Sequence, residues 1–170
     1  MRAPGQECLG GASPEARTLS LPNNSHTPTL AVIGLGYVGL PLALEFARSG
    51  YTVIGLDNDP SKTQLLNEGR CYVKHVPAQD LPALIQSNLF QPTNDFEKLG
   101  GAEAVMICVP TPVTSELEPD PQYVVSASRS IARCLKRGQL IVLESTTYPG
   151  QQRKSCFPSW KGVGSSVRRT

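Results

Sequence analysis

Apolar and polar positions alternate in regular blocks along residues 29–143, and each block has the length and spacing of a strand or a helix. Short apolar runs of β type occupy residues 29–35, 51–56, 89–91, 103–109 and 139–143. Apolar residues at helical spacing, with start and stop signals, occupy residues 38–48, 60–69, 80–87 and 122–136. Strands that alternate with helices form mainly parallel sheets covered on both faces. The pattern therefore predicts one α/β domain over residues 29–150.

The segments on either side of this domain lack the pattern. Residues 1–28 are rich in Gly, Pro and Asn and contain few large apolar residues, so they bury too little surface to offset their ordering entropy. We expect a disordered arm there, with a binding segment for a partner as the alternative. Residues 151–170 are irregular and basic, with five Lys or Arg and no Asp or Glu.

Composition narrows the classes of function. The net charge of +2 argues against nucleic acid or an anionic membrane as the main partner, because both require concentrated Lys and Arg. The five cysteines show no metal or redox spacing, which is typical of a reducing compartment. No apolar stretch approaches the ~20 residues needed to cross a bilayer, and the N-terminus has no signal-peptide core. We expect a cytoplasmic protein without a metal site.

A glycine pattern follows the first predicted strand and opens the first predicted helix, in the segment Gly34-Leu35-Gly36-Tyr37-Val38-Gly39. The first glycine permits a tight turn, the second lets the backbone approach a pyrophosphate, and the third lets the helix pack closely on the sheet. The amides at the helix N-terminus would face the phosphates. The motif in this context predicts a Rossmann-type, doubly wound fold that binds a dinucleotide.

Asp57 ends the second predicted strand, 18 residues after Gly39. A carboxylate at this position can accept hydrogen bonds from both ribose hydroxyls of the adenosine half, whereas it would repel the 2′-phosphate of NADP. Lys62 is the only cation close behind it, and no arginine is near. The sequence therefore favours NAD over NADP.

Four segments together resemble the UDP-glucose/GDP-mannose dehydrogenase family, in the family's order and at its spacing. They are residues 32–41, residues 66–77, residues 108–112 with the Pro119-Asp120 pair, and residues 144–150. The second segment, from Gly69 to Pro77, is more similar to the bacterial-type UDP-N-acetylglucosamine 6-dehydrogenases than to the UDP-glucose enzymes. Its His75 is interpreted as a polar loop residue rather than a catalytic one.

The resemblance implies further cofactor contacts. Tyr37 and Val38 belong to the phosphate-binding turn, and Lys62 would lie along the adenosine ribose. Thr111 would lie at the end of the fourth strand near the cofactor, and Thr146 and Thr147 near the nicotinamide. The alternative for these threonines is that their hydroxyls only cap turns.

The family oxidises the C6 alcohol of a nucleotide sugar to a carboxylate in two NAD-dependent steps. Its catalytic cysteine and most of its sugar-nucleotide site lie in a C-terminal half. We therefore expect a catalytically incomplete fragment with no catalytic residue of its own. The UDP-sugar, and any homo-oligomer, would belong to the complete enzyme. The alternatives are a dinucleotide-binding module without enzymatic activity, or the N-terminal part of another Rossmann dehydrogenase.

The tail after Gly150 departs from the family, which continues there as a helix beginning Thr-Thr-Glu. Permitted codons for the tail, CAA CAA CGG AAG TCG TGC TTC CCC, encode Thr-Thr-Glu-Val-Val-Leu-Pro when they are read two bases later. We therefore expect a frameshift or an altered splice in residues 151–170. On this interpretation Cys156, in a motif similar to the family's catalytic cysteine, has no catalytic role.

Overall fold

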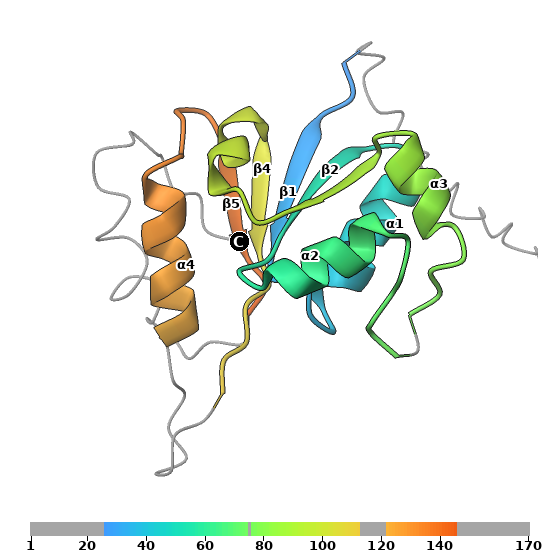
Figure 1. Ribbon diagram of the computed structural model, residues 1–170. Helices are drawn as coiled ribbons and strands as arrows, with labels where there is room; N and C mark the ends of the chain where they lie inside the picture. Colours follow the sequence, from blue (N-terminus) through green and yellow to red (C-terminus); the bar gives the residue numbers. More distant parts are fainter. Residues whose placement is uncertain (1–25, 75, 113–121, 146–170) are drawn as a thin grey trace, which may run out of the picture.

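The computed structural model describes residues 26–74, 76–112 and 122–145, and these residues form a five-stranded sheet in the order β3-β2-β1-β4-β5 (Figure 1). Every neighbouring pair of strands in this sheet is parallel. The strands are β1 Thr29–Ile33, β2 Thr52–Leu56, β3 Phe90–Thr93, β4 Ala104–Ile107 and β5 Leu140–Leu143. The order reverses beside β1, and a ligand crevice forms at such a point in doubly wound folds.

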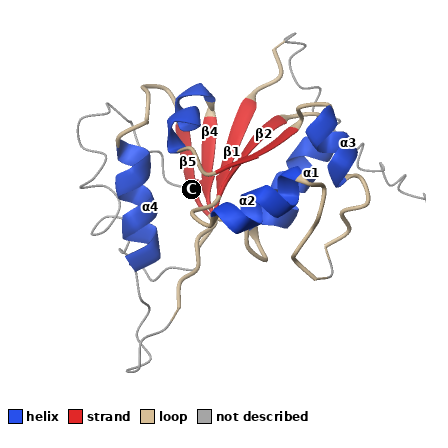
Figure 2. Cartoon of the chain, in the orientation of Figure 1, coloured by secondary structure: helices blue, strands red, loops and turns tan. Residues whose placement is uncertain are grey.

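Helices cover both faces of the sheet (Figure 2). They are α1 Gly39–Arg48, α2 Pro60–Asn67, α3 Leu81–Gln86 and α4 Gln122–Ala132, with a 3-10 helix, η1, at Phe96–Gly101. The first three helices lie against one face, and η1 and α4 lie against the other. The sequence prediction of a Rossmann-type, doubly wound α/β fold is confirmed.

Alternating side chains of the strands build one apolar core on each face. In β1, Leu30 and Val32 pack toward α1 and α3, whereas Ala31 and Ile33 pack toward η1 and α4. This alternation explains why the strands read as continuous apolar runs, since both of their faces are covered. Phe90 of β3 is fully buried and belongs to the core on the α1 side.

Most element boundaries differ from the sequence prediction by one or two residues, and two of the differences have a clear structural reason. The helix expected over residues 122–136 ends at Ala132, and the amides of Cys134 and Leu135 then turn back to the Ile131 carbonyl. The strand expected at residues 89–91 extends to Thr93 and includes Pro92. Proline is tolerated there because β3 pairs only with β2 and leaves its other edge without a strand in the described sheet.

Several expectations fall on residues that the structure does not describe. These are the N-terminal arm, His75, Thr146, Thr147 and the tail with Cys156. Among the described residues, no helix is long and apolar enough to span a membrane.

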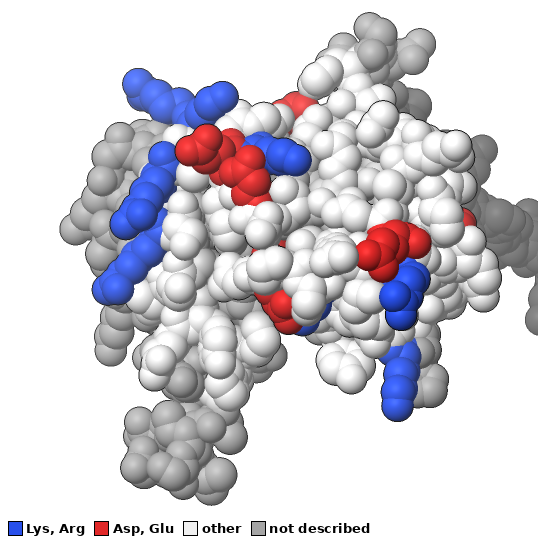
Figure 3. Space-filling view, viewed as in Figure 1, with Lys and Arg blue, Asp and Glu red and all other residues white. Residues whose placement is uncertain are grey.

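Charge is unevenly distributed over the visible face. Basic side chains gather over α4, while the rest of the face carries both signs (Figure 3). Arg129 of α4, and Arg133, Lys136 and Arg137 just after it, are all exposed. None of the four lines the pocket described next.

Candidate cofactor-binding site

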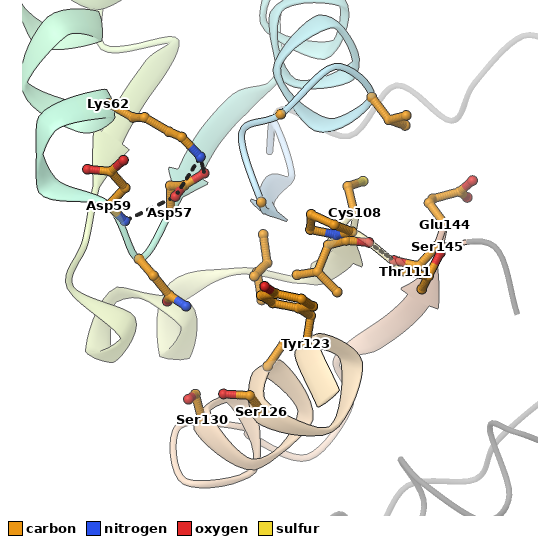
Figure 4. Close-up of a pocket in the computed structure, with 18 of the residues that line it drawn as sticks. Asp57, Asp59, Lys62, Cys108, Thr111, Tyr123, Ser126, Ser130, Glu144 and Ser145 are labelled. Atoms are coloured by element: carbon orange, nitrogen blue, oxygen red, sulfur yellow. Dashed lines mark hydrogen bonds and ion pairs between the residues drawn. The ribbon is translucent and has the colours of Figure 1, made fainter. Parts of the chain in front are cut away.

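A pocket of about 480 Å³ lies at the carboxyl ends of the central strands, where the order of the sheet reverses. One wall comes from the glycine turn after β1 and from the segment after β2, and the other comes from α4 and the ends of β4 and β5 (Figure 4). The sequence-predicted site residues that line it are Gly34, Gly36, Tyr37, Val38, Asp57, Lys62 and Thr111. Residues far apart in the sequence therefore meet in one crevice.

Packing requires two of the three motif glycines. Gly34 has a φ of +89°, and a Cβ on it would lie 2.7 Å from the carbonyl oxygen of Cys108. A Cβ on Gly39 would overlap the carbonyl oxygen of Gly34 and lie 3.0 Å from the Cβ of Cys108. Gly39 is buried under this contact, which fits the expected close packing of α1 on the sheet.

Gly36 is different, because a Cβ on it would meet no atom within 4 Å. Neither its φ nor its neighbours require a glycine there, yet the residue lines the pocket. An open approach to the backbone is what a bound diphosphate needs. Gly36 is thus the motif glycine that points to a ligand.

The turn also offers backbone donors. Within residues 26–74, 76–112 and 122–145, nothing accepts a hydrogen bond from the amides of Gly36, Tyr37 or Val38. The first bond of the following helix runs from the Leu40 amide to the Gly36 carbonyl, and α1 has no side-chain cap at its N-terminus. Free amides at a helix N-terminus form a site for an anion.

The Asp57 carboxylate lies at the end of β2, is only 7% exposed, and accepts four hydrogen bonds. Oδ2 accepts from the Leu35 amide at 2.9 Å, and Oδ1 accepts from the Asp59 amide at 3.0 Å. Lys62 Nζ donates to both oxygens, at 3.2 Å and 3.3 Å (Figure 4). Asp57 therefore holds the glycine turn and Lys62 at the same time.

Asp59 supports the same corner of the pocket. Its carboxylate caps α2 by accepting from both the amide and the hydroxyl of Ser61, at 2.9 Å and 2.6 Å. These hydrogen bonds hold the pKa of Asp59 below its usual range. The cap fixes the start of α2, from which Lys62 reaches Asp57.

The Ser145 hydroxyl stabilises the opposite wall of the pocket by donating to the Val109 carbonyl at 2.7 Å, which joins the segment after β5 to the segment after β4.

Cys108 is buried beneath the glycine turn, and burial, with a smaller effect of Glu144, raises the pKa of its thiol to about 11. A thiol that stays protonated near neutral pH is a poor nucleophile. Cys108 therefore serves packing.

Sequence reasoning missed the α4 side of the pocket. Tyr123, Ser126 and Ser130 line it, as do Glu144 and Ser145 after β5. Tyr123, Ser126 and Ser130 lie at helical spacing on one face of α4. The sequence therefore shows that they share a face, but not that this face lines the pocket.

The residues present fit a dinucleotide. Open space over Gly36 and free amides at the start of α1 suit the diphosphate. The buried Asp57 carboxylate beyond them suits the adenosine ribose. The fold and the site together define a dinucleotide-binding Rossmann domain.

The chain belongs to the UDP-glucose/GDP-mannose dehydrogenase family, because the model of that family's NAD binding domain matches residues 28–161. Its cofactor is NAD.

The curated relatives are enzymes named for several different nucleotide sugars. The chain is 36% identical over 129 residues to a UDP-N-acetyl-D-glucosamine 6-dehydrogenase of Pseudomonas aeruginosa, an alignment covering 76% of the chain and 30% of that protein. It is 40% identical over 131 residues to a UDP-N-acetyl-D-mannosamine dehydrogenase of Escherichia coli, covering 74% of the chain and 30% of that protein. The chain thus spans about a third of the length of these relatives.

Solved structures agree on the fold. A UDP-D-ManNAc dehydrogenase of Pyrococcus horikoshii superposes with a TM-score of 0.74 at 33% identity, over 83% of this chain and 33% of that one. A ternary complex of GDP-mannose dehydrogenase from Pseudomonas aeruginosa gives 0.69 at 27% identity, over 79% and 32%.

Proposed function

We propose that this chain is the NAD-binding part of a nucleotide-sugar 6-dehydrogenase, which oxidises the C6 alcohol of UDP-N-acetylglucosamine or UDP-glucose to a carboxylate for polysaccharide precursor synthesis. The observation that carries the proposal is the open space over Gly36 next to the buried Asp57 carboxylate, in a chain that belongs to this family. The sugar nucleotide, and any homo-oligomer, belong to the complete enzyme. The free thiols of Cys71, Cys108 and Cys134 support a cytoplasmic location.

The proposed roles of the residues follow from their positions. NAD supplies the hydride acceptor when it is bound, and the chain binds and orients it. The amides from Gly36 to Gly39 hold the diphosphate, Asp57 accepts hydrogen bonds from the ribose hydroxyls, and Lys62 lies beside that ribose. Thr111, which lines the pocket after β4, lies on the side away from Asp57 and would face the nicotinamide half (Figure 4). We propose the same location for Thr146 and Thr147.

The identity of the sugar is the finer part of the proposal. Segment 69–77 favours a UDP-N-acetylglucosamine enzyme, and the relatives that align with about three quarters of the chain include enzymes named for N-acetylglucosamine and for N-acetylmannosamine. A chimera that joins residues 26–145 of this chain to the remainder of the Pseudomonas aeruginosa relative provides a test. Initial rates of NADH formation would be compared for UDP-N-acetylglucosamine, UDP-N-acetylmannosamine and UDP-glucose.

The unmodified 170-residue chain is the reference for this test. It should bind NAD in calorimetry and form no NADH with any of the three sugars, whereas the chimera should form NADH. Robust turnover by the chain alone would contradict the fragment interpretation. NAD binding by an inactive chimera would favour the second candidate, a dinucleotide-binding module without enzymatic activity. Failure of the chain to bind NAD would overturn both.

We also propose that residues 151–170 arise from a shifted reading frame. Codons that the genetic code permits for the tail would give the family's Thr-Thr-Glu continuation in the shifted frame, and this supports the proposal. Sequencing the transcript and the genomic DNA after codon 150 tests it. A single open frame that runs through the tail into further dehydrogenase sequence would contradict the proposal, and the family match that continues to residue 161 is the finding that weighs against it.

A further inference from the structure

We propose that Tyr72 is a positioning residue for the phosphate-binding turn, and that it acts on the cofactor through the peptide between Leu35 and Gly36 rather than by contact. This inference rests on the proposed function only in that NAD binds at this turn. Tyr72 does not line the pocket. It lies in the connection between α2 and α3, within the 69–77 segment that resembles the UDP-N-acetylglucosamine enzymes.

Both backbone polar groups of Leu35 are held by side chains from distant parts of the chain. The Leu35 amide donates to Asp57 Oδ2 at 2.9 Å, and the Leu35 carbonyl accepts from the Tyr72 hydroxyl in a short hydrogen bond. The Leu35 side chain is itself fully buried in the core on the α1 side. Leu35 is therefore fixed at three points, and its carbonyl depends on Tyr72.

Peptide geometry transmits this hold to the pocket. A peptide unit is planar and trans, so the N–H of one residue points opposite to the C=O of the residue before it. Fixing the Leu35 carbonyl on Tyr72 therefore fixes the direction of the Gly36 N–H. That amide has no acceptor among the described residues, and Gly36 lines the pocket. The Tyr72 hydroxyl thus aims a donor at the place proposed for the diphosphate.

The segment that carries Tyr72 is anchored on both sides. The next residue, Val73, is buried in the same core as Leu35. Further along, Arg48 at the end of α1 donates to the Pro77 carbonyl and to both carboxylate oxygens of Asp80. The anchors hold the phenol beside the turn, and among the described residues its hydroxyl is the only hydrogen-bond donor to the Leu35 carbonyl oxygen.

The phenol is suited to this task because it remains a donor. Burial, followed by the negative charge of Asp57, raises the pKa of Tyr72 well above its usual value. The hydroxyl therefore stays protonated throughout the neutral and mildly alkaline range, and its bond to Leu35 does not depend on pH there.

Replacing Tyr72 by phenylalanine removes only the hydroxyl, and Tyr51→Phe is the matched control. Tyr51 is also partly buried, packs edge-on against Phe46 with ring centroids 6.0 Å apart, and donates no hydrogen bond to a described residue. Calorimetry on the full chain would use NAD and ADP, and an NMR titration would use adenosine, which has no diphosphate. Thermal melts would establish that each variant is folded.

Tyr72→Phe should weaken NAD and ADP binding about three- to tenfold, the range for loss of one buried hydrogen bond. Adenosine binding should be unchanged, because its ribose still meets Asp57. Tyr51→Phe should change none of the three affinities. Unchanged NAD affinity in Tyr72→Phe, or an equal loss for adenosine, would overturn the positioning role and leave the proposed function intact. Absence of NAD binding by the unmodified chain would overturn the function and this inference together.

A second measurement needs no variant. In the unmodified chain, the Tyr72 hydroxyl proton should exchange slowly with water and show a nuclear Overhauser effect to the backbone of Leu35 or Gly36. The Tyr51 hydroxyl should exchange fast. A rapidly exchanging Tyr72 hydroxyl would contradict the proposal even if Tyr72→Phe failed to fold.

Discussion

The carboxylate of Asp57 serves the fold and the site at once. It is buried, receives two backbone amides, and attracts the Lys62 ammonium group. Ribose hydroxyls would add to these donors or displace Lys62, whose side chain is 36% exposed. In the proposed complex, the cofactor and Lys62 would therefore compete for, or share, one anionic acceptor.

Asp57→Ala should weaken NAD binding at least about tenfold, since hydrogen bonds to a charged group contribute roughly 1.5–3 kcal/mol. Asp57→Asn is the matched variant, because it keeps the shape and the Leu35 contact but loses the charge. Isothermal titration of both variants and the unmodified chain gives the comparison. An unaltered NAD affinity in Asp57→Ala would show that the site described here is not where NAD binds.

Substitutions at two of the motif glycines should separate the effect on folding from the effect on cofactor binding. Gly36→Ala meets open space and should leave the free energy of unfolding within about 1 kcal/mol of the original, while reducing NAD affinity. Gly39→Ala forces a Cβ onto the Gly34 carbonyl and should cost roughly 3 kcal/mol or more. Urea unfolding and calorimetry measure the two quantities. Equal stability losses at the two positions would contradict the geometry.

Sequence reasoning succeeds at residues whose role is local. Gly34, Gly36 and Asp57 could be identified because a strand, a turn, a helix and a second strand fix their relative positions along the chain. Tyr72 and Ser145 could not, because each bonds a backbone carbonyl 36 or 37 residues away, and no sequence pattern marks that pairing.

Among the elements, α1 connects the pocket at one end to α3 at the other. Its N-terminus opens on the pocket, and Arg48 in its last turn joins it to Asp80 at the start of α3, at 2.7 Å and 2.8 Å. The hydrogen bond from Arg48 holds the pKa of Asp80 below its usual range. This ion pair is largely at the surface, so its contribution to stability is modest.

Asp80→Asn should lower the free energy of unfolding by about 0.5–1 kcal/mol at pH 7. Because the folded pKa of Asp80 is depressed, the stabilisation is complete above the unfolded pKa of about 3.9 and disappears as the pH falls through the lower folded value. Urea unfolding at several pH values should show the two proteins converging below about pH 4. Glu68→Gln, at the more exposed pair with Arg70 at 3.5 Å, is the control and should change nothing measurable.

The types of the secondary-structure elements could be predicted from the sequence, but their boundaries could be predicted less well. Apolar runs and terminal signals located the five strands and four α-helices of the described residues, because strands buried on both faces are continuously apolar and Pro60 marks the start of α2. The 3-10 helix η1 was not predicted, because its six residues have only one buried apolar side chain, Leu99. The shortened α4 reflects the tertiary environment after Ala132, which a periodic pattern cannot report.

At the scale of the whole molecule, the proposed cofactor site lies at the reversal of strand order, so binding there should stabilise the entire fold. NAD at about 100 times its Kd should add roughly 2.7 kcal/mol and raise the Tm by about 5–10 °C. NADP at the same concentration should give a smaller shift, because Asp57 faces its 2′-phosphate and Lys62 is already paired with Asp57. Differential scanning calorimetry tests this, and Asp57→Asn should narrow the gap. An equal or larger shift with NADP would contradict the assignment.

The contrast between the crowded glycines and the open one has an evolutionary consequence. Selection for a folded domain alone preserves Gly34 and Gly39, because any side chain there collides with backbone. Packing does not require glycine at position 36. A descendant that had lost cofactor binding would therefore accumulate substitutions at this position first. Among such descendants, the middle glycine, rather than the motif as a whole, would distinguish domains that still bind the cofactor from domains that do not.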